Sequence, residues 1–268
     1  MAISVAELRD KPRPVDDWII EGLLTRGNTA FVMGPPKKAC KSWLLLDAMW
    51  SLSEGQPMWQ VEGLKPPKQM RTVYFTQEDT ERNIQDRVLL HLNVGHREAT
   101  DRLWIVPKDL NMVLDTPEGF AQIKRELHSV VEKAGAIDLV VFDPMRKMHV
   151  GEENDSQTIG RLWARLDAIH QLFGCATIIA HHVKKPPHDR ANYDPTDPFQ
   201  GRGSGDIYGG GDAFVMVVPG PLASDGKSWR RVDAHFESKR GEQIAPVRLE
   251  VSFVSGGVKL IGNVTPAI

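Results

Sequence analysis

The sequence has few cysteines, no long apolar run and no excess of charge of one sign. Its two cysteines, Cys40 and Cys175, lie far apart and fit no metal-ligand spacing, so we expect two free thiols in a reducing cytoplasm. No apolar run approaches the roughly 18 residues of a membrane span, and the N-terminus lacks a signal-peptide core. These absences predict a cytoplasmic protein that is not held in a membrane.

The net charge of -2 excludes a global basic field of the kind that attracts nucleic acid. A local basic lining remains open, because a few well-placed Lys or Arg residues suffice for phosphate contacts. Hydrophobic residues make up 41% and charged residues 25% of the 268-residue chain, which is ordinary for a globular protein. A chain of this length can bury a core without metals or disulfides.

Short apolar runs alternate with helical patterns along the chain. The early runs are almost continuously apolar, as in central parallel strands, whereas those after Asp212 alternate polar and apolar residues. We therefore predict an α/β fold with a mostly parallel sheet, flanking helices and antiparallel strands added at the C-terminal end. The expected strands are Thr29–Met33, Thr72–Thr76, Leu103–Val106, Asp138–Phe142, Ala176–Ala180, Ala213–Val218, Arg231–Ser238, Val247–Phe253 and Val258–Ile261. The expected helices cover residues 40–54, 79–94, 116–134 and 156–173.

The whole chain, 1–268, is interpreted as one domain. It has an N-terminal arm at residues 1–27 and closing strands at residues 213–268. The longest stretch without a periodic pattern, residues 184–211, is rich in Pro, Gly, Asp and Asn. Loops of this length inside a domain are usually functional or disordered.

A phosphate-binding loop is predicted where an apolar strand meets Lys41-Ser42 at the start of a helix. Backbone N–H groups and the helix N-terminus would bind phosphates, Lys41 would reach the β- and γ-phosphates, and Ser42 would bind Mg²⁺. The residues expected around the nucleotide are Gly34, Pro36, Lys38, Ala39, Cys40, Lys41, Ser42 and Trp43. An ordinary strand-to-helix turn that happens to contain Lys-Ser is the alternative.

The loop departs from the pattern G-x-x-x-x-G-K-[ST]. Counting back from Lys41, Cys40 takes the place of the second glycine and Pro35 that of the first, while Gly34 is one residue early. A side chain at Cys40 constrains a position that glycine normally leaves free.

Two acidic residues follow further apolar strands. Glu78 comes just past the strand Thr72–Thr76 and is the candidate base for the attacking water. The alternative is an acid favoured by a helix N-terminus, a place that Asp79 or Glu81 would fill as well. Asp143 ends Leu139-Val-Val-Phe-Asp143, a Walker-B pattern, and would hold Mg²⁺ through water.

The strand Ala176–Ala180 ends in His181-His182. Two histidines at this sheet edge could sense the γ-phosphate and relay its loss to the following loop. A metal site would need a third ligand, and no cysteine or further histidine follows at that strand end. For at least one of the pair, a hydrogen-bonded buried histidine is the alternative.

With these residues assembled, the chain resembles the RecA-like ATPases grouped with the plasmid-encoded hexameric replicative helicase RepA, and more distantly DnaB and RadA. The resemblance runs from about Trp18 to Phe253, and its most specific stretch is residues 143–155 followed by the histidine pair. It implies a RecA-like P-loop core. It also implies Glu78 as catalytic base, Asp143 as Walker-B residue, a phosphate-sensing role for His182 or His181, and Arg87 near the nucleotide.

One departure from that family concerns the arginine finger, which follows the aspartate matching Asp212. This chain has Ala213-Phe-Val-Met there. The segment containing Lys239 and Arg240 resembles one that, in RecA-like rings, reaches a neighbour's nucleotide. A cation supplied in this way would stabilise the developing phosphate charge. The alternative is a solvated hairpin end.

The loop after the histidine-bearing strand lines the pore in RecA-like rings. Here it carries basic residues among aromatics, which suits single-stranded nucleic acid. The candidate contacts are Lys184, Lys185, Arg190 and Arg202. A lid is the alternative, because several aspartates offset the charge.

These features predict an Mg²⁺-dependent ATPase that assembles into a ring, most simply a hexamer, and acts as a DNA helicase or translocase on single-stranded DNA. One alternative is a recombination-mediator ATPase that forms filaments without unwinding DNA. Another is a nucleotide-binding regulatory protein with weak hydrolysis, which the cysteine at position 40 motivates.

Overall fold

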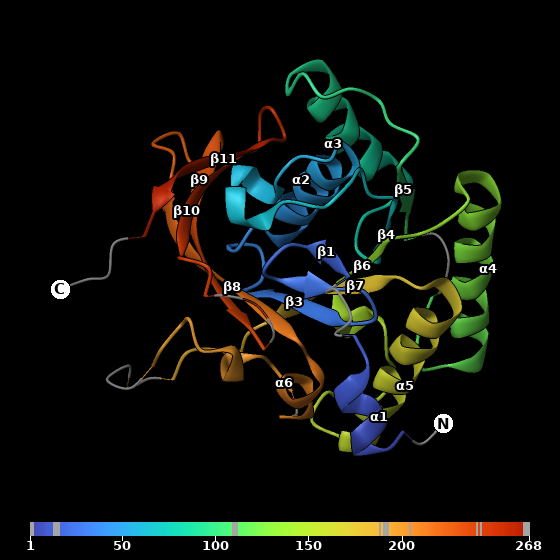
Figure 1. Ribbon diagram of the computed structural model, residues 1–268. Coiled ribbons are helices and arrows are strands. Elements are labelled where there is room, and N and C mark those ends of the chain that lie inside the picture. The colour runs from blue at the N-terminus through green and yellow to red at the C-terminus, as the bar shows by residue number, and fades with distance from the viewer. Residues whose placement is uncertain are drawn as a thin grey trace.

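A computed structural model describes residues 3–12, 17–108, 112–187, 189, 193–203, 205–239, 241 and 243–264. In this part of the chain a nine-stranded sheet forms the centre of the molecule, with helices on both faces (Figure 1). The strand order is β11-β10-β9-β8-β3-β7-β6-β4-β5. The strands from β5 to β8 run parallel, and β9, β10 and β11 are antiparallel to their neighbours. The predicted fold class, an α/β sheet extended by antiparallel C-terminal strands, is confirmed.

The nine predicted strands and four predicted helices are all present, with ends that differ by four residues or fewer. The strands are β3 (Thr29–Gly34), β4 (Thr72–Thr76), β5 (Leu103–Val106), β6 (Leu139–Asp143), β7 (Ala176–His182), β8 (Ala213–Leu222), β9 (Trp229–Ser238), β10 (Val247–Ser252) and β11 (Val258–Asn263). The helices are α2 (Lys41–Ser53), α3 (Glu81–Asn93), α4 (Pro117–Ala134) and α5 (Ser156–Phe173). In the described part of the chain, no helix is long and apolar enough to cross a membrane.

Several short elements were not predicted, because two to six residues are too few to show a period. The N-terminal arm contains α1 (Val5–Asp10), and β1 (Trp18–Ile20) pairs with β2 (Leu24–Thr25) in a separate small sheet. Residues 184–211, expected to lack regular structure, contain the 3-10 helix η4 (Pro198–Gln200) and the short helix α6 (Asp206–Gly210). Two more 3-10 helices, η1 (Met58–Gln60) and η2 (Glu62–Leu64), follow α2, and η3 (Met145–Lys147) follows β6.

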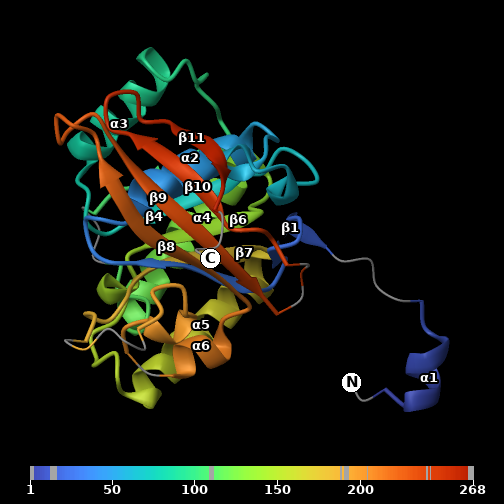
Figure 2. The same ribbon diagram turned by 90° about the vertical axis from the view of Figure 1, so that its left-hand side faces the viewer.

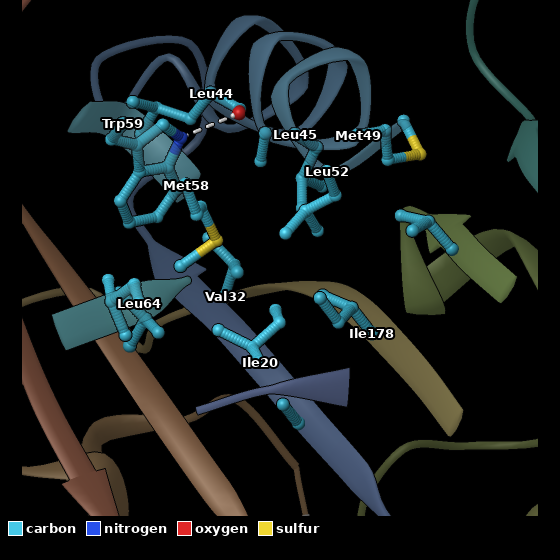
Figure 3. Packing of buried hydrophobic residues seen from close by; sticks show 14 of the residues in the cluster. Ile20, Val32, Leu44, Leu45, Met49, Leu52, Met58, Trp59, Leu64 and Ile178 are labelled. Atoms are coloured by element: carbon cyan, nitrogen blue, oxygen red, sulfur yellow. Dashed lines mark hydrogen bonds between the residues drawn. The ribbon is translucent and has the colours of Figure 1, made fainter. Parts of the chain in front are cut away.

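Two apolar clusters fill the space on either side of the sheet. The first joins α2 to β3, β8, β9 and β10, and the second joins α4 and α5 to the opposite face. Helix α2 is covered almost all round, because η1 packs on its outer side and Trp59 Nε1 donates a hydrogen bond to the Leu44 carbonyl at 2.8 Å (Figure 3). This burial holds the N-terminus of α2 firmly against the C-terminal end of β3.

A buried carboxylate ties the C-terminal strands to α2. Asp47 is 1% exposed, and its Oδ1 accepts hydrogen bonds from the Val258 backbone N–H and from Arg97 Nη2, each at 3.2 Å. Its Oδ2 has no hydrogen-bond partner among the described residues. Burial raises the pKa of Asp47 to about 6, although Arg97 and the Val258 N–H lower it. The ionised form is therefore accommodated less well in the folded protein than in the unfolded chain.

The Asp47 carboxyl is expected to make stability depend on pH. Its folded pKa lies above its unfolded value, so its stabilising contribution is complete below pH 4 and is lost as pH rises through about 6. We expect the difference in unfolding free energy between the wild type and Asp47→Asn to change across pH 4–6 and to be constant above pH 7. Denaturant unfolding at several pH values measures it, and a difference that stays constant throughout would contradict the prediction.

Candidate nucleotide-binding site

A tight loop connects the central strand β3 to α2. Strand β3 lies between β7 and β8, and the chain passes from Gly34 through residues 35–40 into α2. A Cβ atom at Gly34 would lie 2.6 Å from Ala39 Cβ and 2.7 Å from the Val217 carbonyl oxygen, so only glycine fits there. Gly34 therefore permits the close return of the loop, one residue earlier than in the standard pattern.

Cys40, the residue before the helix, has the backbone conformation that glycine favours. Its φ of 53° and ψ of 26° lie in the left-handed region, where a Cβ atom is strained. Both cysteines are free and buried, as expected. Burial raises the pKa of the Cys40 thiol to about 11, which keeps it protonated at neutral pH. The departure from glycine thus changes the side chain and adds strain, but the loop keeps the backbone conformation typical of glycine.

Lys41 is the first residue of α2 and is only 6% exposed. Its Nζ donates to the Gly34 carbonyl at 2.9 Å and lies 3.2 Å from His182 Nδ1. Burial lowers the pKa of this ammonium to about 8, while the nearby charges of Asp143 and Glu78 act in the opposite direction. Lys41 thus lies where the predicted phosphate loop meets α2, and the charges of both predicted acids, Asp143 and Glu78, act on its ammonium group.

Among the remaining loop residues, Pro36 and Lys38 are exposed at the tip, whereas Ala39 is buried beneath it. Ser42 and Trp43 follow Lys41 in the first turn of α2 and are both half-buried. Backbone N–H groups at this helix end have no partners within the helix, which favours an anion there.

Asp143 ends β6 beside the end of β4. It is 4% exposed, and its Oδ2 accepts a hydrogen bond from Tyr74 Oη at 2.6 Å. Tyr74 is fully buried in β4, and burial together with Asp143 raises its pKa well above the ordinary value. The tyrosine therefore remains a donor and fixes one carboxylate oxygen of Asp143.

Glu78 and Asp79 follow β4 but differ in surroundings. Asp79 is buried and forms a bidentate ion pair with Arg87, with Nη1–Oδ2 and Nη2–Oδ1 distances of 2.6 and 3.1 Å. Glu78 is exposed, and no hydrogen bond to its carboxylate occurs in the described residues. Helix α3 begins later, with Thr80 as its N-cap. Of the two acids, Glu78 is the one whose carboxylate is open to water.

Arg87 also contacts the first turn of α2. Its guanidinium lies 5.0 Å from the centroid of the Trp43 ring, and Phe253 meets that ring edge-on with centroids 5.7 Å apart. Arg87 is thus held close to the predicted nucleotide by Asp79 and Trp43 together.

The two histidines point to opposite faces of β7, as successive strand residues do. His182 faces Lys41, and burial followed by the Lys41 charge lowers its pKa, which favours the neutral ring. His181 lies against Phe31 and its Nε2 bonds to the Arg202 carbonyl at 2.6 Å, while burial lowers its pKa to about 4. His181 was predicted at the nucleotide; it lies instead on the far side of the strand, as a buried, hydrogen-bonded histidine.

Arg202 belongs to a buried polar cluster on that far side. Its Nε lies 3.0 Å from Glu153 Oε2, and His149 Nε2 lies 3.5 Å from Glu153 Oε1. Burial raises the pKa of the Glu153 carboxyl, but His149, His181 and Arg202 together hold it below its ordinary value. The Arg202 backbone N–H also donates to the His182 carbonyl at 2.9 Å. The loop 184–211 is therefore attached to the end of β7 at Arg202.

The remaining predicted residues lie apart from this cluster. Lys184 and Lys185 follow β7, and Lys185 is exposed. Lys239 follows β9 at the opposite edge of the sheet, where its Nζ donates to the Tyr208 and Gly209 carbonyls at 3.3 and 3.0 Å. Arg190 and Arg240 lie outside the described residues. Within the described part of the chain, no three His, Cys, Asp or Glu residues form a metal-binding group.

A family model described as an AAA domain matches residues 1–188 of this chain. The chain belongs to this AAA domain family. It is also similar in fold to a KaiC-like protein from the hyperthermophilic archaeon Pyrococcus horikoshii OT3, with a TM-score of 0.55 and 12% identity over 90% of this chain and 93% of that one. Family and fold together support a RecA-like P-loop ATPase. This assignment accounts for the tight loop that Gly34 permits, for the buried Lys41 and for the acidic residues at the ends of the strands. The RepA-type helicase subfamily stays a prediction.

The sequence did not indicate several residues that shape the site. Tyr74 is one residue in a continuous apolar run, and the sequence indicates Asp79 only as an acid favoured by a helix N-terminus. Glu153 lies within residues 143–155, and the resemblance gives it no role. Tyr74 and Asp143 stand 69 positions apart in the sequence, so no local pattern could identify this pair.

Because Cys40 has a left-handed backbone conformation, glycine should be more stable than alanine at this position, the reverse of their order in a helix. In a helix, glycine is less stable than alanine by about 1 kcal/mol. At position 40 we expect Cys40→Gly to unfold with a free energy about 1 kcal/mol higher than Cys40→Ala, because both lose the thiol but only alanine keeps the strain. Chemical denaturation of the two variants compares them. A more stable alanine variant would show that this loop conformation is wrong.

Proposed function

We propose that the protein hydrolyses ATP with Mg²⁺ and couples hydrolysis to movement on, or unwinding of, DNA, as a ring-forming helicase or translocase of the RepA type. The observation that carries the proposal is the joint placement of Lys41, Glu78, Asp143 and His182 around one loop. These groups meet the needs of phosphoryl transfer, which are to hold the phosphates, orient a water and neutralise charge.

Lys41 would exchange its bond to the Gly34 carbonyl for the β- and γ-phosphate oxygens. The backbone N–H groups of the loop and the first turn of α2 would bind the same phosphates. Glu78, open to water, would accept a proton from the attacking water as it approaches in line. Trp43 and Arg87 would contact the nucleotide beyond the phosphates, since Trp43 lies in the first turn of α2 and Arg87 of α3 lies over its ring.

The chain offers a suitable place for Mg²⁺. Tyr74 occupies one oxygen of the buried Asp143 carboxylate, and the other has no hydrogen bond among the described residues. With the Ser42 hydroxyl this gives few protein ligands, which is usual for Mg²⁺ that also binds substrate phosphates and water. The ion would neutralise phosphate charge.

His182 would connect the phosphates to the loop 184–211. A nucleotide that draws Lys41 towards its γ-phosphate would change the contact of Lys41 with His182 Nδ1. The same residue accepts a hydrogen bond from the Arg202 backbone, so a shift of His182 would reach the loop directly. Loss of the γ-phosphate after hydrolysis would reverse the shift.

A ring would complete the site. Lys239 lies at the opposite edge of the sheet from its own phosphate loop, since Lys239 N–H bonds to the Asp212 carbonyl at the start of β8. It would therefore reach a nucleotide only on a neighbouring subunit. Arg240 would act beside it.

We expect Glu78→Gln to lower the ATP turnover number about 10²- to 10⁴-fold and to leave ATP affinity nearly unchanged, because it removes a general base. Lys41→Ala should lower the affinity itself. Steady-state phosphate release and equilibrium binding of ATP measure the two effects. Glu81→Gln, which removes another exposed acid, in the first turn of α3, is the control and should behave as wild type. Unchanged turnover in both Glu78→Gln and Lys41→Ala would refute the ATPase assignment.

DNA coupling is expected to depend on Lys184 and Lys185. Replacing both by alanine should weaken the binding of single-stranded DNA whatever its sequence. The slope of the logarithm of the binding constant against the logarithm of the salt concentration should fall by about one to two, as for the loss of one to two phosphate contacts. Basal ATPase activity should be unchanged. Fluorescence anisotropy at several salt concentrations measures this, with Lys65→Ala, a lysine exposed after η2, as control. Equal DNA binding in all variants would remove this loop from the proposed interface.

Strand displacement on forked DNA separates the helicase from its alternatives. Unwinding that needs ATP supports the helicase, and filaments on DNA without unwinding would support the recombination-mediator ATPase. Tight ATP binding with no phosphate release, even with single-stranded DNA, would support a regulatory protein. The strained Cys40 is the observation that favours this last alternative.

A further inference from the structure

Arg230 extends a row of core residues on the α2 side of the sheet. Alternate residues of β9 point to the same face, and Val232 and Ala234 belong to the apolar cluster around α2. Their partners on β10, Leu249 and Val247, belong to it as well. Arg230 continues this row and pairs with Val251, another member of the cluster. Its side chain therefore starts on the face that α2 covers.

The row ends at the edge of the sheet where α2 begins. Strand β9 is antiparallel to β8, so its first residues lie beside the last residues of β8. Strand β8 is parallel to β3, and Val217 of β8 touches Gly34 at the start of the phosphate loop. Figure 2 shows β8, β9, β10 and β11 crossing in front of α2. Arg230 is thus placed on the α2 side, at the same edge as the N-terminus of α2.

The charge of Arg230 has an unfavourable setting in the absence of an anion. The N-terminus of a helix carries partial positive charge, and Lys41 adds a full charge at this helix end. Burial raises the pKa of the Cys40 thiol, and Arg230 opposes this more than Lys41 does. The geometry agrees, because Phe253 donates its backbone N–H to the Ser228 carbonyl and packs edge-on against Trp43, so the start of β9 lies at the same end of the sheet as the first turn of α2. No ion pair or hydrogen bond of the Arg230 side chain is found within the described residues.

The next residue, Arg231, shows what a structural arginine looks like in the same strand. It points to the other face, its Nε lies 3.4 Å from Glu250 Oε2, and its guanidinium lies 5.0 Å from the centroid of the Trp229 ring. Both contacts account for Arg231 without a ligand. Among the described residues Arg230 has no such contacts, and it lies at the same end of the sheet as Lys41 and the start of α2, a setting that suits a group with several negative charges.

We propose that Arg230 binds the phosphate chain of the nucleoside triphosphate held by its own subunit. This rests on the proposed ATPase function and adds a phosphate ligand to it. A guanidinium can bind two phosphate oxygens at once, which a lysine cannot do. The chain has no arginine directly after Asp212, and Arg230 supplies a positive charge to the same site from within the subunit.

The first test compares Arg230→Gln and Arg230→Lys with the matched control Arg231→Gln. Binding of a fluorescent ATP analogue is measured, with inorganic tripolyphosphate as competitor. We expect Arg230→Gln to weaken the binding of both compounds about 10- to 100-fold, as for loss of a charged hydrogen bond. Arg230→Lys should recover part of this affinity, and Arg231→Gln should bind as wild type. Thermal unfolding verifies that the variants are folded.

Wild-type binding of both compounds by Arg230→Gln, together with lost binding in Lys41→Ala, would overturn the role of Arg230 and leave the ATPase assignment intact. Wild-type binding by both variants would refute the ATPase assignment itself. A loss of ATP binding without a loss of tripolyphosphate binding would also overturn the proposal, because it would place Arg230 at the nucleoside instead of the phosphates.

A mixing experiment tests whether Arg230 acts within its own subunit. Arg230→Gln and Lys41→Ala subunits are combined, and ATP turnover is compared with the sum of the two alone. No recovery is expected, since every subunit in the mixture lacks one phosphate ligand of its own site. Recovered turnover would show that Arg230 serves a neighbour and would overturn the proposal. A mixture of Lys239→Ala with Lys41→Ala is the comparison, because a residue that acts on a neighbour restores activity.

Discussion

The buried ammonium group of Lys41 is the constraint on which the site depends. A charge this deep is costly unless it has partners, and its direct contacts are uncharged groups, the Gly34 and Pro35 carbonyls and His182 Nδ1. Its lowered pKa, about 8, reflects that cost. The carboxylates of Asp143 and Glu78 act only through space. The loop is thus preorganised for an anion, because a phosphate would supply the negative charge that these contacts lack.

The position of Lys41 follows from its neighbours in the fold. Glycine at position 34 lets the loop return against β8, and a left-handed Cys40 turns the chain into α2. Helix α2 is in turn covered by η1 and held by the contact of Asp47 with Val258. Strain at Cys40 persists because the surrounding core determines the path of the chain on both sides of it.

Much of this fold could be predicted from the sequence, because the central strands are continuous apolar runs and α5 shows one regular apolar face. The sequence also predicts that Lys41, Glu78 and Asp143 lie near one another, because each follows a parallel strand and the carboxyl ends of parallel strands lie at one edge of the sheet. What could not be predicted depends on how the elements pack against one another. Which histidine faces Lys41 depends on the register of β7, and the pairing of Arg87 with Asp79 depends on how α3 packs.

The antiparallel strands at the C-terminal end are part of the site as well as an extension of the sheet. Val258 bonds to Asp47 of α2, and Phe253 packs on Trp43. These two contacts join the C-terminal strands to one helix, and Arg230 lies at the same end of the sheet as the start of that helix. A residue of these strands that binds phosphate would move when α2 moves, because the packing that buries Asp47 also holds β9 in line with the helix. Nucleotide binding would therefore act on two sides of the molecule, through His182 on β7 and through Arg230 on β9.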